Sequence, residues 1–202
     1  MMKNNTRLTA LALATILAGA CSGVMDSKQP ARQYYLLTPD TTSSGTGNPT
    51  EGPALSMTVS VVPGLDTDRV LALSPDARLS PYANARWPDH LPEVITSVLK
   101  RSLAASGSFS SVEDSTRLSD DGWLLTLEIQ QFYGIRDASG STSSVTVEMN
   151  GSIECGHERE VFTLSDSNSI GEERLSTVVA AHQRSLDEVT RQLLAEIEEN
   201  CS

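Results

Sequence analysis

The sequence predicts an α+β domain in which a mainly antiparallel sheet carries two amphipathic helices packed on one face. Apolar residues recur at helical spacing in two stretches, 91–103 and 178–197. Several other stretches alternate apolar and polar residues, which is typical of half-buried strands. Strands come first, then a helix, more strands and a second helix, an order that favours helices layered on a sheet.

The N-terminus is typical of a bacterial lipoprotein signal. Lys3 and Arg7 form a positive region, and the apolar run that follows is too short to span a bilayer. Small residues then precede Cys21, with Leu17 one position further from the cysteine than usual. We therefore predict that Cys21 is lipidated, the alternative being plain secretion with a free thiol. Ser22, by resemblance to lipoprotein sorting signals, points to the outer membrane.

These signals divide the chain into three parts. Residues 1–20 are the predicted signal peptide, and 21–32, which are small and polar, form a tether. Residues 33–202 have the length of a single domain.

The domain is acidic, which bears on its partners. Residues 1–20 hold two basic residues and no acidic one, so their removal changes the formal net charge from −11 to −13. A basic surface is needed to bind nucleic acid, and an acidic one is repelled by an anionic leaflet. The composition therefore argues against nucleic acid as a partner and against a domain that spreads on an anionic leaflet. In the simplest interpretation, the charge serves solubility.

The strands predicted before the first helix are short and apolar or alternating. Pro63 and Gly64 end the second of them, and Asp66–Arg69 is a turn. The segment 79–85 is interpreted as a connector. The predicted strands are 33–38, 55–62 and 70–73.

The first helix has the clearest boundaries. Asp89 or His90 stands at the cap position, Pro92 suits the first turn, and Glu93 favours the positive end of the helix dipole. Gly107 is the expected stop.

The strands predicted after this helix are separated by short turns, which favours an antiparallel meander. The second helix closes the sequence. The predicted strands are 109–112, 123–133, 144–153 and 161–164.

No catalytic or metal-binding pattern stands out. A nucleophile elbow, a phosphate loop and a dinucleotide fingerprint are all missing. Cys155 and His157 lack a second pair of metal ligands, and His182 lies on an apolar stripe, where a packed histidine is expected. We expect no enzyme activity, no cofactor and no metal.

Cys155 and Cys201 form an even pair once Cys21 carries lipid. In an oxidising compartment, such a pair predicts a disulfide that joins the last helix to the meander, the alternative being two free thiols.

Four features together resemble the family of ABC-type transport auxiliary lipoproteins. They are the cysteine signal, the run Tyr34-Tyr35-Leu36-Leu37, the segment from Val59 to Val70, and the pair Arg86-Trp87. The proline after Arg-Trp is displaced here relative to the family pattern, and the resemblance extends over 34–200.

The resemblance implies a non-enzymatic lipoprotein anchored to the periplasmic face of the outer membrane. Its partner would be a mammalian-cell-entry (MCE) protein of an ABC-type lipid transport system. The resemblance leaves open whether the protein forms homo-oligomers. Arg86 and Trp87 are candidates for partner contact or for structure, with core packing as the simpler role of Trp87. The alternatives are a lipoprotein that carries lipid itself and an envelope hydrolase.

Overall fold

The computed structural model describes residues 31–39, 52–117, 122–172 and 174–201. Residues Arg32–Ser202 form one compact unit. Cys21 and the predicted signal peptide lie outside the described residues.

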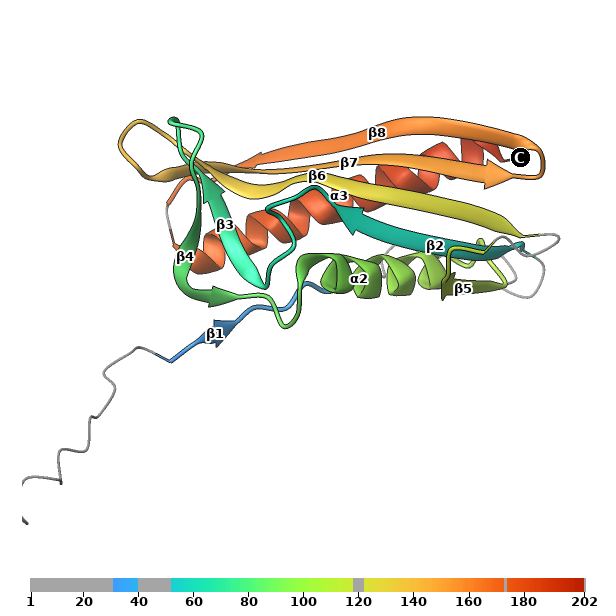
Figure 1. Cartoon of the computed structure of the whole chain (residues 1–202), viewed down its shortest axis with the longest axis horizontal. Helices are drawn as coiled ribbons and strands as arrows, with labels where there is room; N and C mark the ends of the chain where they lie inside the picture. Colours follow the sequence, from blue (N-terminus) through green and yellow to red (C-terminus); the bar gives the residue numbers. More distant parts are fainter. Residues whose placement is uncertain (1–30, 40–51, 118–121, 173, 202) are drawn as a thin grey trace, which may run out of the picture. The chain divides into compact units, whose positions relative to one another are not determined.

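The described chain contains eight strands and two helices, α2 and α3 (Figure 1). In order, they are β1 (Gln33–Tyr34), β2 (Ala54–Val61), β3 (Arg69–Leu73), β4 (Leu79–Arg86), α2 (Leu91–Ser106), β5 (Ser111–Asp114), β6 (Trp123–Arg136), β7 (Thr142–Cys155), β8 (Glu158–Ser169) and α3 (Leu175–Asn200).

The long strand β6 organises the sheet. Along one edge, its first half pairs with β2 and its last residues pair with β3, both in parallel. Along the other edge it pairs with β7, which pairs with β8, both antiparallel. The predicted meander is therefore confirmed for β6, β7 and β8.

The prediction of a mainly antiparallel sheet needs correction, because the sheet is mixed. Four of the described pairings are parallel (β1–β4, β2–β5, β2–β6 and β3–β6) and three are antiparallel. A parallel pair requires a crossover connection, and α2 lies within the crossover from β2 to β5. The alternation of β2 shows that it is a strand but carries no information on which neighbour it pairs with.

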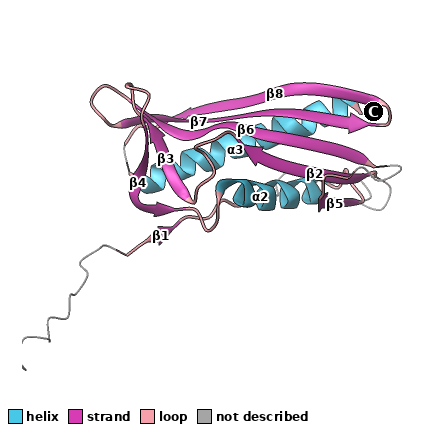
Figure 2. Ribbon diagram, in the orientation of Figure 1, coloured by secondary structure: helices cyan, strands magenta, loops and turns pink. Residues whose placement is uncertain are grey.

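Both helices cover the same face of the sheet (Figure 2). β6 turns Leu125, Leu127 and Ile129 toward them, and these side chains are fully buried. α2 packs on β2 and β5, whereas α3 packs on β7 and β8. The predicted apolar stripes of both helices are the buried ones.

The predicted boundaries of α2 are confirmed. His90 is the N-cap residue, although its side chain makes no capping hydrogen bond, and proline lies in the first turn. Gly107 ends the helix in the left-handed conformation, with φ 75°.

Three strands differ most from their predicted extent, and β5 begins two residues later than predicted. The segment interpreted as a connector is strand β4, whose partly exposed, mixed side chains hide its character. β1 is only two residues long, because it pairs with β4 at Gln33 and Tyr34 alone. β8 is longer than predicted, because β7 pairs with it over its whole length.

Neither described helix is long and apolar enough to cross a membrane.

A disulfide joins Cys155, at the end of β7, to Cys201, directly after α3. The two Cα atoms are 5.8 Å apart, and the bridged residues are 46 positions apart in sequence. The bridge fixes the last turn of α3 to the sheet.

Replacing both cysteines by serine should lower the free energy of unfolding by about 2–4 kcal/mol, because the unfolded chain regains the freedom that the closed loop removes. Urea unfolding of the oxidised protein and of the Cys155→Ser/Cys201→Ser variant measures this difference. Equal stabilities would contradict a structural role for the bridge.

Candidate functional site

The turn Asp66–Asp68 meets the start of α2. The first backbone N–H groups of a helix have no partner within it and carry partial positive charge. The carbonyl of Thr67 accepts a hydrogen bond from the N–H of Leu91, at 3.2 Å. The carboxylate of Asp66 lies 2.7 Å from Nδ1 of His90, and this hydrogen bond raises the pKa of His90. The turn thus caps the helix from outside.

Arg86 and Trp87 are held by the same turn. The N–H of Trp87 donates to the carbonyl of Asp68 at 2.7 Å, and the guanidinium of Arg86 donates to the Asp68 carboxylate. On the other side, the Arg86 carbonyl accepts from the N–H of Tyr35 at 2.8 Å. We call Asp66–Asp68, Arg86, Trp87 and His90 the α2 junction.

The indole of Trp87 joins the α2 junction to the core. Its side chain is 1% exposed and meets the ring of Phe132 on β6 edge to face, with centroids 5.8 Å apart. It meets His182 on α3 in the same way, at 5.5 Å, and the Phe132 and His182 rings lie 4.9 Å apart. Edge-to-face contacts are a favoured arrangement of aromatic rings. One cluster therefore connects the start of α2, the sheet and α3.

His182 is the predicted packed histidine and is fully buried. Desolvation lowers its pKa to about 4, because burial disfavours the charged imidazolium. At neutral pH, its Nδ1–H donates to the carbonyl of Val178 at 3.0 Å, while Nε2 has no hydrogen-bond partner. The imidazole acts here as a neutral aromatic ring.

The segment after β1, residues 35–38, lies against this region. Leu37 is 4% exposed and belongs to the core. The side-chain amide of Gln183 on α3 forms two hydrogen bonds with the backbone of Thr38: its oxygen accepts from the N–H and its nitrogen donates to the carbonyl, both at 2.8 Å. We call residues 33–38 the strap, because this segment is fixed to β4 at one end and to α3 at the other.

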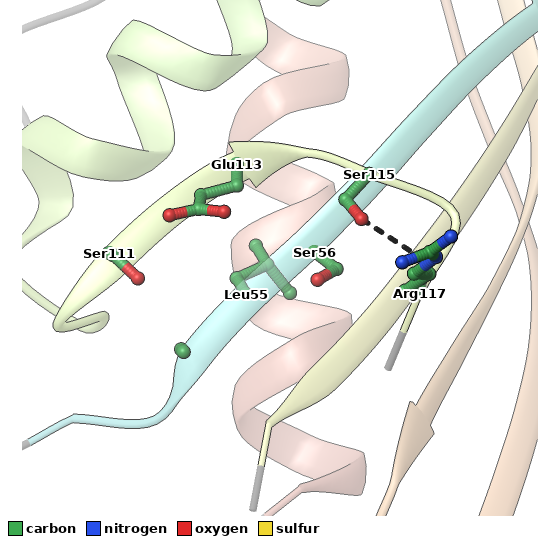
Figure 3. A pocket seen from close by; sticks show the side chains of 7 residues that line it. Leu55, Ser56, Ser111, Glu113, Ser115 and Arg117 are labelled. Carbon is green, nitrogen blue, oxygen red and sulfur yellow. Dashed lines mark hydrogen bonds between the residues drawn. The ribbon is translucent and has the colours of Figure 1, made fainter. Parts of the chain in front are cut away.

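A groove of about 290 Å³ is lined by residues of β2, of the edge strand β5 and of the segment after β5 (Figure 3). In it, the N–H of Arg117 donates to the hydroxyl of Ser115 at 3.1 Å. Serines, an exposed glutamate and this arginine dominate its lining, so it resembles an ordinary polar strand edge. Its lining residues are Ala54, Leu55, Ser56, Ser111, Glu113, Ser115 and Arg117.

The described residues contain no group of side chains that could hold a metal ion. Asp66 and Asp68 instead bond His90 and Arg86, which accounts for both carboxylates. The α2 junction can hold a helix and a strap in place, but it presents no nucleophile beside a base.

The predicted site residues fall in three places. Cys21 lies outside the described residues, and Cys155 and Cys201 are bridged. Arg86 and Trp87 lie together in the α2 junction, where the indole is buried and the guanidinium is mostly covered. Sequence reasoning missed the partners Asp68, Phe132 and Gln183, because nothing local marks a contact between distant elements.

The ion pair between Asp68 and Arg86 should contribute measurable stability, since the two side chains are only 34% and 16% exposed. Asp68→Asn and Arg86→Gln should each lower the free energy of unfolding by about 1–3 kcal/mol, with a coupling of about 1 kcal/mol in a double-mutant cycle. Urea unfolding of the four proteins gives these values.

The matched control is the exposed pair of Asp76 and Arg78, whose side chains are 58% and 73% exposed. Its coupling should not exceed about 0.5 kcal/mol. A coupling as small as this for Asp68 and Arg86 would show that the α2 junction does not depend on its charges.

His182 should make the protein acid-sensitive. Its pKa is about 4 in the folded protein, against 6.5 for an unperturbed imidazole, so the unfolded chain takes up the proton first as the pH falls. The stability that His182 contributes is present above pH 6.5 and is lost toward pH 4. Between pH 7 and pH 4, the wild type should lose about 3 kcal/mol more than His182→Gln, which cannot titrate.

Chemical unfolding at several pH values measures this difference. Parallel pH profiles for the wild type and His182→Gln would contradict a neutral, desolvated His182.

Solved structures of other proteins share the fold of this chain. Among solved structures, a protein from Xanthomonas campestris superposes with a TM-score of 0.68 at 20% identity, covering 80% of this chain and 92% of that one. A second, uncharacterised protein gives a TM-score of 0.63 at 13% identity, covering 83% and 99%. At these identities, the likeness shows the fold alone.

No match is found among curated proteins. The family model of the ABC-type transport auxiliary lipoprotein component matches residues 34–194, a range that spans the strap, the α2 junction and most of α3. The chain therefore belongs to the family of ABC-type transport auxiliary lipoprotein components.

Proposed function

We propose that this protein is a non-enzymatic lipoprotein of the periplasm that is anchored to the outer membrane through Cys21 and binds the MCE protein of an ABC-type lipid transport system. The observation that carries the proposal is the family match, because it extends over 34–194 and so over nearly the whole folded unit. Membership indicates a lipoprotein held at an envelope membrane; the choice of membrane and of partner is our inference.

The tether limits where the domain works. Only the chain between Cys21 and Gln33 separates the lipid from the first strand, and twelve extended residues span at most about 43 Å. Several acyl chains on one cysteine anchor a protein stably. The domain is thereby confined to a thin layer beside the membrane, where it can receive a partner that reaches across the periplasm.

The folded unit has a surface at the end of α3 that is far from the strap. Gln183 binds the strap, and α3 rises about 27 Å from there to Cys201. The turn between β7 and β8 lies at this far end, and the first residues of β8 after it include Glu158 and Glu160, both exposed. We assign partner binding to this end, which also includes the start of β6, where Trp123 pairs with Cys155.

The alternative function is a lipid carrier with a cavity of its own. An acyl chain needs apolar walls, and ligand sites are mostly apolar. A second groove, of about 380 Å³, lies beside α2, and five of the seven residues that line it are polar or charged, as are five of the seven that line the groove in Figure 3. These walls favour the binding role. The groove beside α2 is lined by Val59, Pro92, Glu93, Thr96, Ser97, Lys100 and Asp114.

Anchoring is tested by acyl labelling and membrane fractionation of the full-length protein. The wild type should carry label and sediment with the outer membrane, whereas Cys21→Ala should do neither, because it offers no thiol to the acyl chains. A soluble, unlabelled wild type would contradict the anchor. Label in the inner membrane would contradict the assignment of the membrane.

Partner binding is tested by co-elution of the protein with the MCE protein. Charge reversal at the far end, Glu158→Lys/Glu160→Lys, should weaken the complex at least tenfold, a change of about 1.4 kcal/mol. The matched control is Asp76→Lys, an exposed reversal in the turn between β3 and β4. If no complex forms at tens of micromolar protein, the proposal is left without support. If both variants lose the same affinity for the MCE protein, the binding surface is not at the far end.

A further inference from the structure

The strap is apolar on both sides. Tyr35 and Leu37 pack against the core, while Tyr34 is 58% exposed and Leu36 is 70% exposed. Alternate residues of an extended segment point to opposite sides, so Tyr34 and Leu36 share the outward side. They are two of the three large apolar residues with high exposure among those described, the third being Val161 at 74%.

This pattern is unusual for the edge of a sheet. β1 is the last strand on its side, next to β4. Soluble proteins usually place charged or polar residues on such edges, because an apolar edge invites association. The fold does not use these two side chains, since strap and core are already joined through Leu37, Tyr35 and the Gln183 amide. Their outward position indicates a contact with something outside the domain.

We propose that Tyr34 and Leu36 insert into the surface of the membrane that holds the lipid anchor, and so orient the domain. The proposal rests on the lipidation of Cys21. The length of the tether identifies the membrane as the contact: only eleven residues, 22–32, separate Cys21 from Gln33, so the strap is the part of the described domain that lies nearest the bilayer along the chain.

The chemistry of the two side chains fits this surface. Tyrosine is enriched at the membrane–water interface, where its ring meets the acyl chains and its hydroxyl meets water. Leucine contributes apolar area. Two side chains bind weakly on their own, but the anchor already holds them at an effective concentration of the order of millimolar, so a weak contact suffices.

The contact would set the direction of the whole domain. The strap is fixed to β4 by backbone pairing and to α3 by Gln183, so it cannot swing freely. With the strap on the membrane, the Cys155–Cys201 end of α3 lies toward the periplasm. Figure 1 shows β1 and the C-terminal end of α3 at opposite ends of the folded unit.

The test uses the full-length lipidated protein in vesicles of phosphatidylethanolamine and phosphatidylglycerol whose acyl chains carry bromine, a quencher of tryptophan. Leu36→Trp should lose several times more emission than Val161→Trp, a matched site of similar exposure on β8. Wild-type protein in the same vesicles gives the background of Trp87 and Trp123. Adding Tyr34→Ser to Leu36→Trp should reduce the quenching.

Flotation of the vesicles distinguishes the lipid anchor on Cys21 from the membrane contact of the strap. Protein that floats while Leu36→Trp stays unquenched keeps the anchor and overturns the membrane contact. Protein that does not float overturns the anchor itself. Equal quenching at both sites would show that the domain has no preferred orientation on the membrane. Tryptophan emission from Leu36→Trp that is shifted to the blue but not quenched would show that the strap contacts protein and not lipid. Either result overturns the proposal.

Discussion

The burial of one indole ring holds this domain together. Trp87 follows β4 directly, and its ring touches Phe132 on β6 and His182 on α3. Its backbone N–H is bonded to Asp68 in the turn before β3. A ring of this size contributes a large part of any core, and contacts between aromatic edges and faces fix its orientation. The sheet, both helices and the turn therefore share one packing centre.

His182 fits this centre only as a neutral ring. A charged imidazolium without a counter-ion is costly in an apolar interior, and desolvation accordingly lowers its pKa to about 4. The carbonyl of Val178 satisfies Nδ1, and Nε2 stays without a partner. The stability of the helix packing is thus tied to a group that changes charge in mildly acidic solution.

Two glutamines of α3 each form a pair of hydrogen bonds with the backbone of one residue in another segment. Gln183 binds the backbone of Thr38, and Gln192 forms the same two hydrogen bonds with Ser165 on the edge strand β8, each at 3.2 Å. A side-chain amide can replace the donor and acceptor of a missing neighbouring strand. At Ser165 this covers part of an edge that could otherwise pair with another chain. At Thr38 it fixes the strap, at the start of the domain, to α3.

The sequence alone determined the helices, because their apolar periodicity, first-turn proline and terminal glycine are local signals. It determined the meander for the same reason, since short turns impose antiparallel pairing on the strands they join. It also indicated the family, and it indicated that His182 belongs to the core.

Only the tertiary structure decided how these pieces meet. The parallel pairing of β2 with β6 depends on a neighbour that is distant in sequence. The strand β4 pairs with the adjacent β3 and with the distant β1, but in the sequence a half-exposed strand looks like a connector. The same holds for the site: the turn at Asp68, the pair Arg86–Trp87 and the strap are separate motifs in the sequence. They become one unit because unpaired helix N–H groups, a guanidinium and a large apolar ring each require a partner, and the fold brings those partners together.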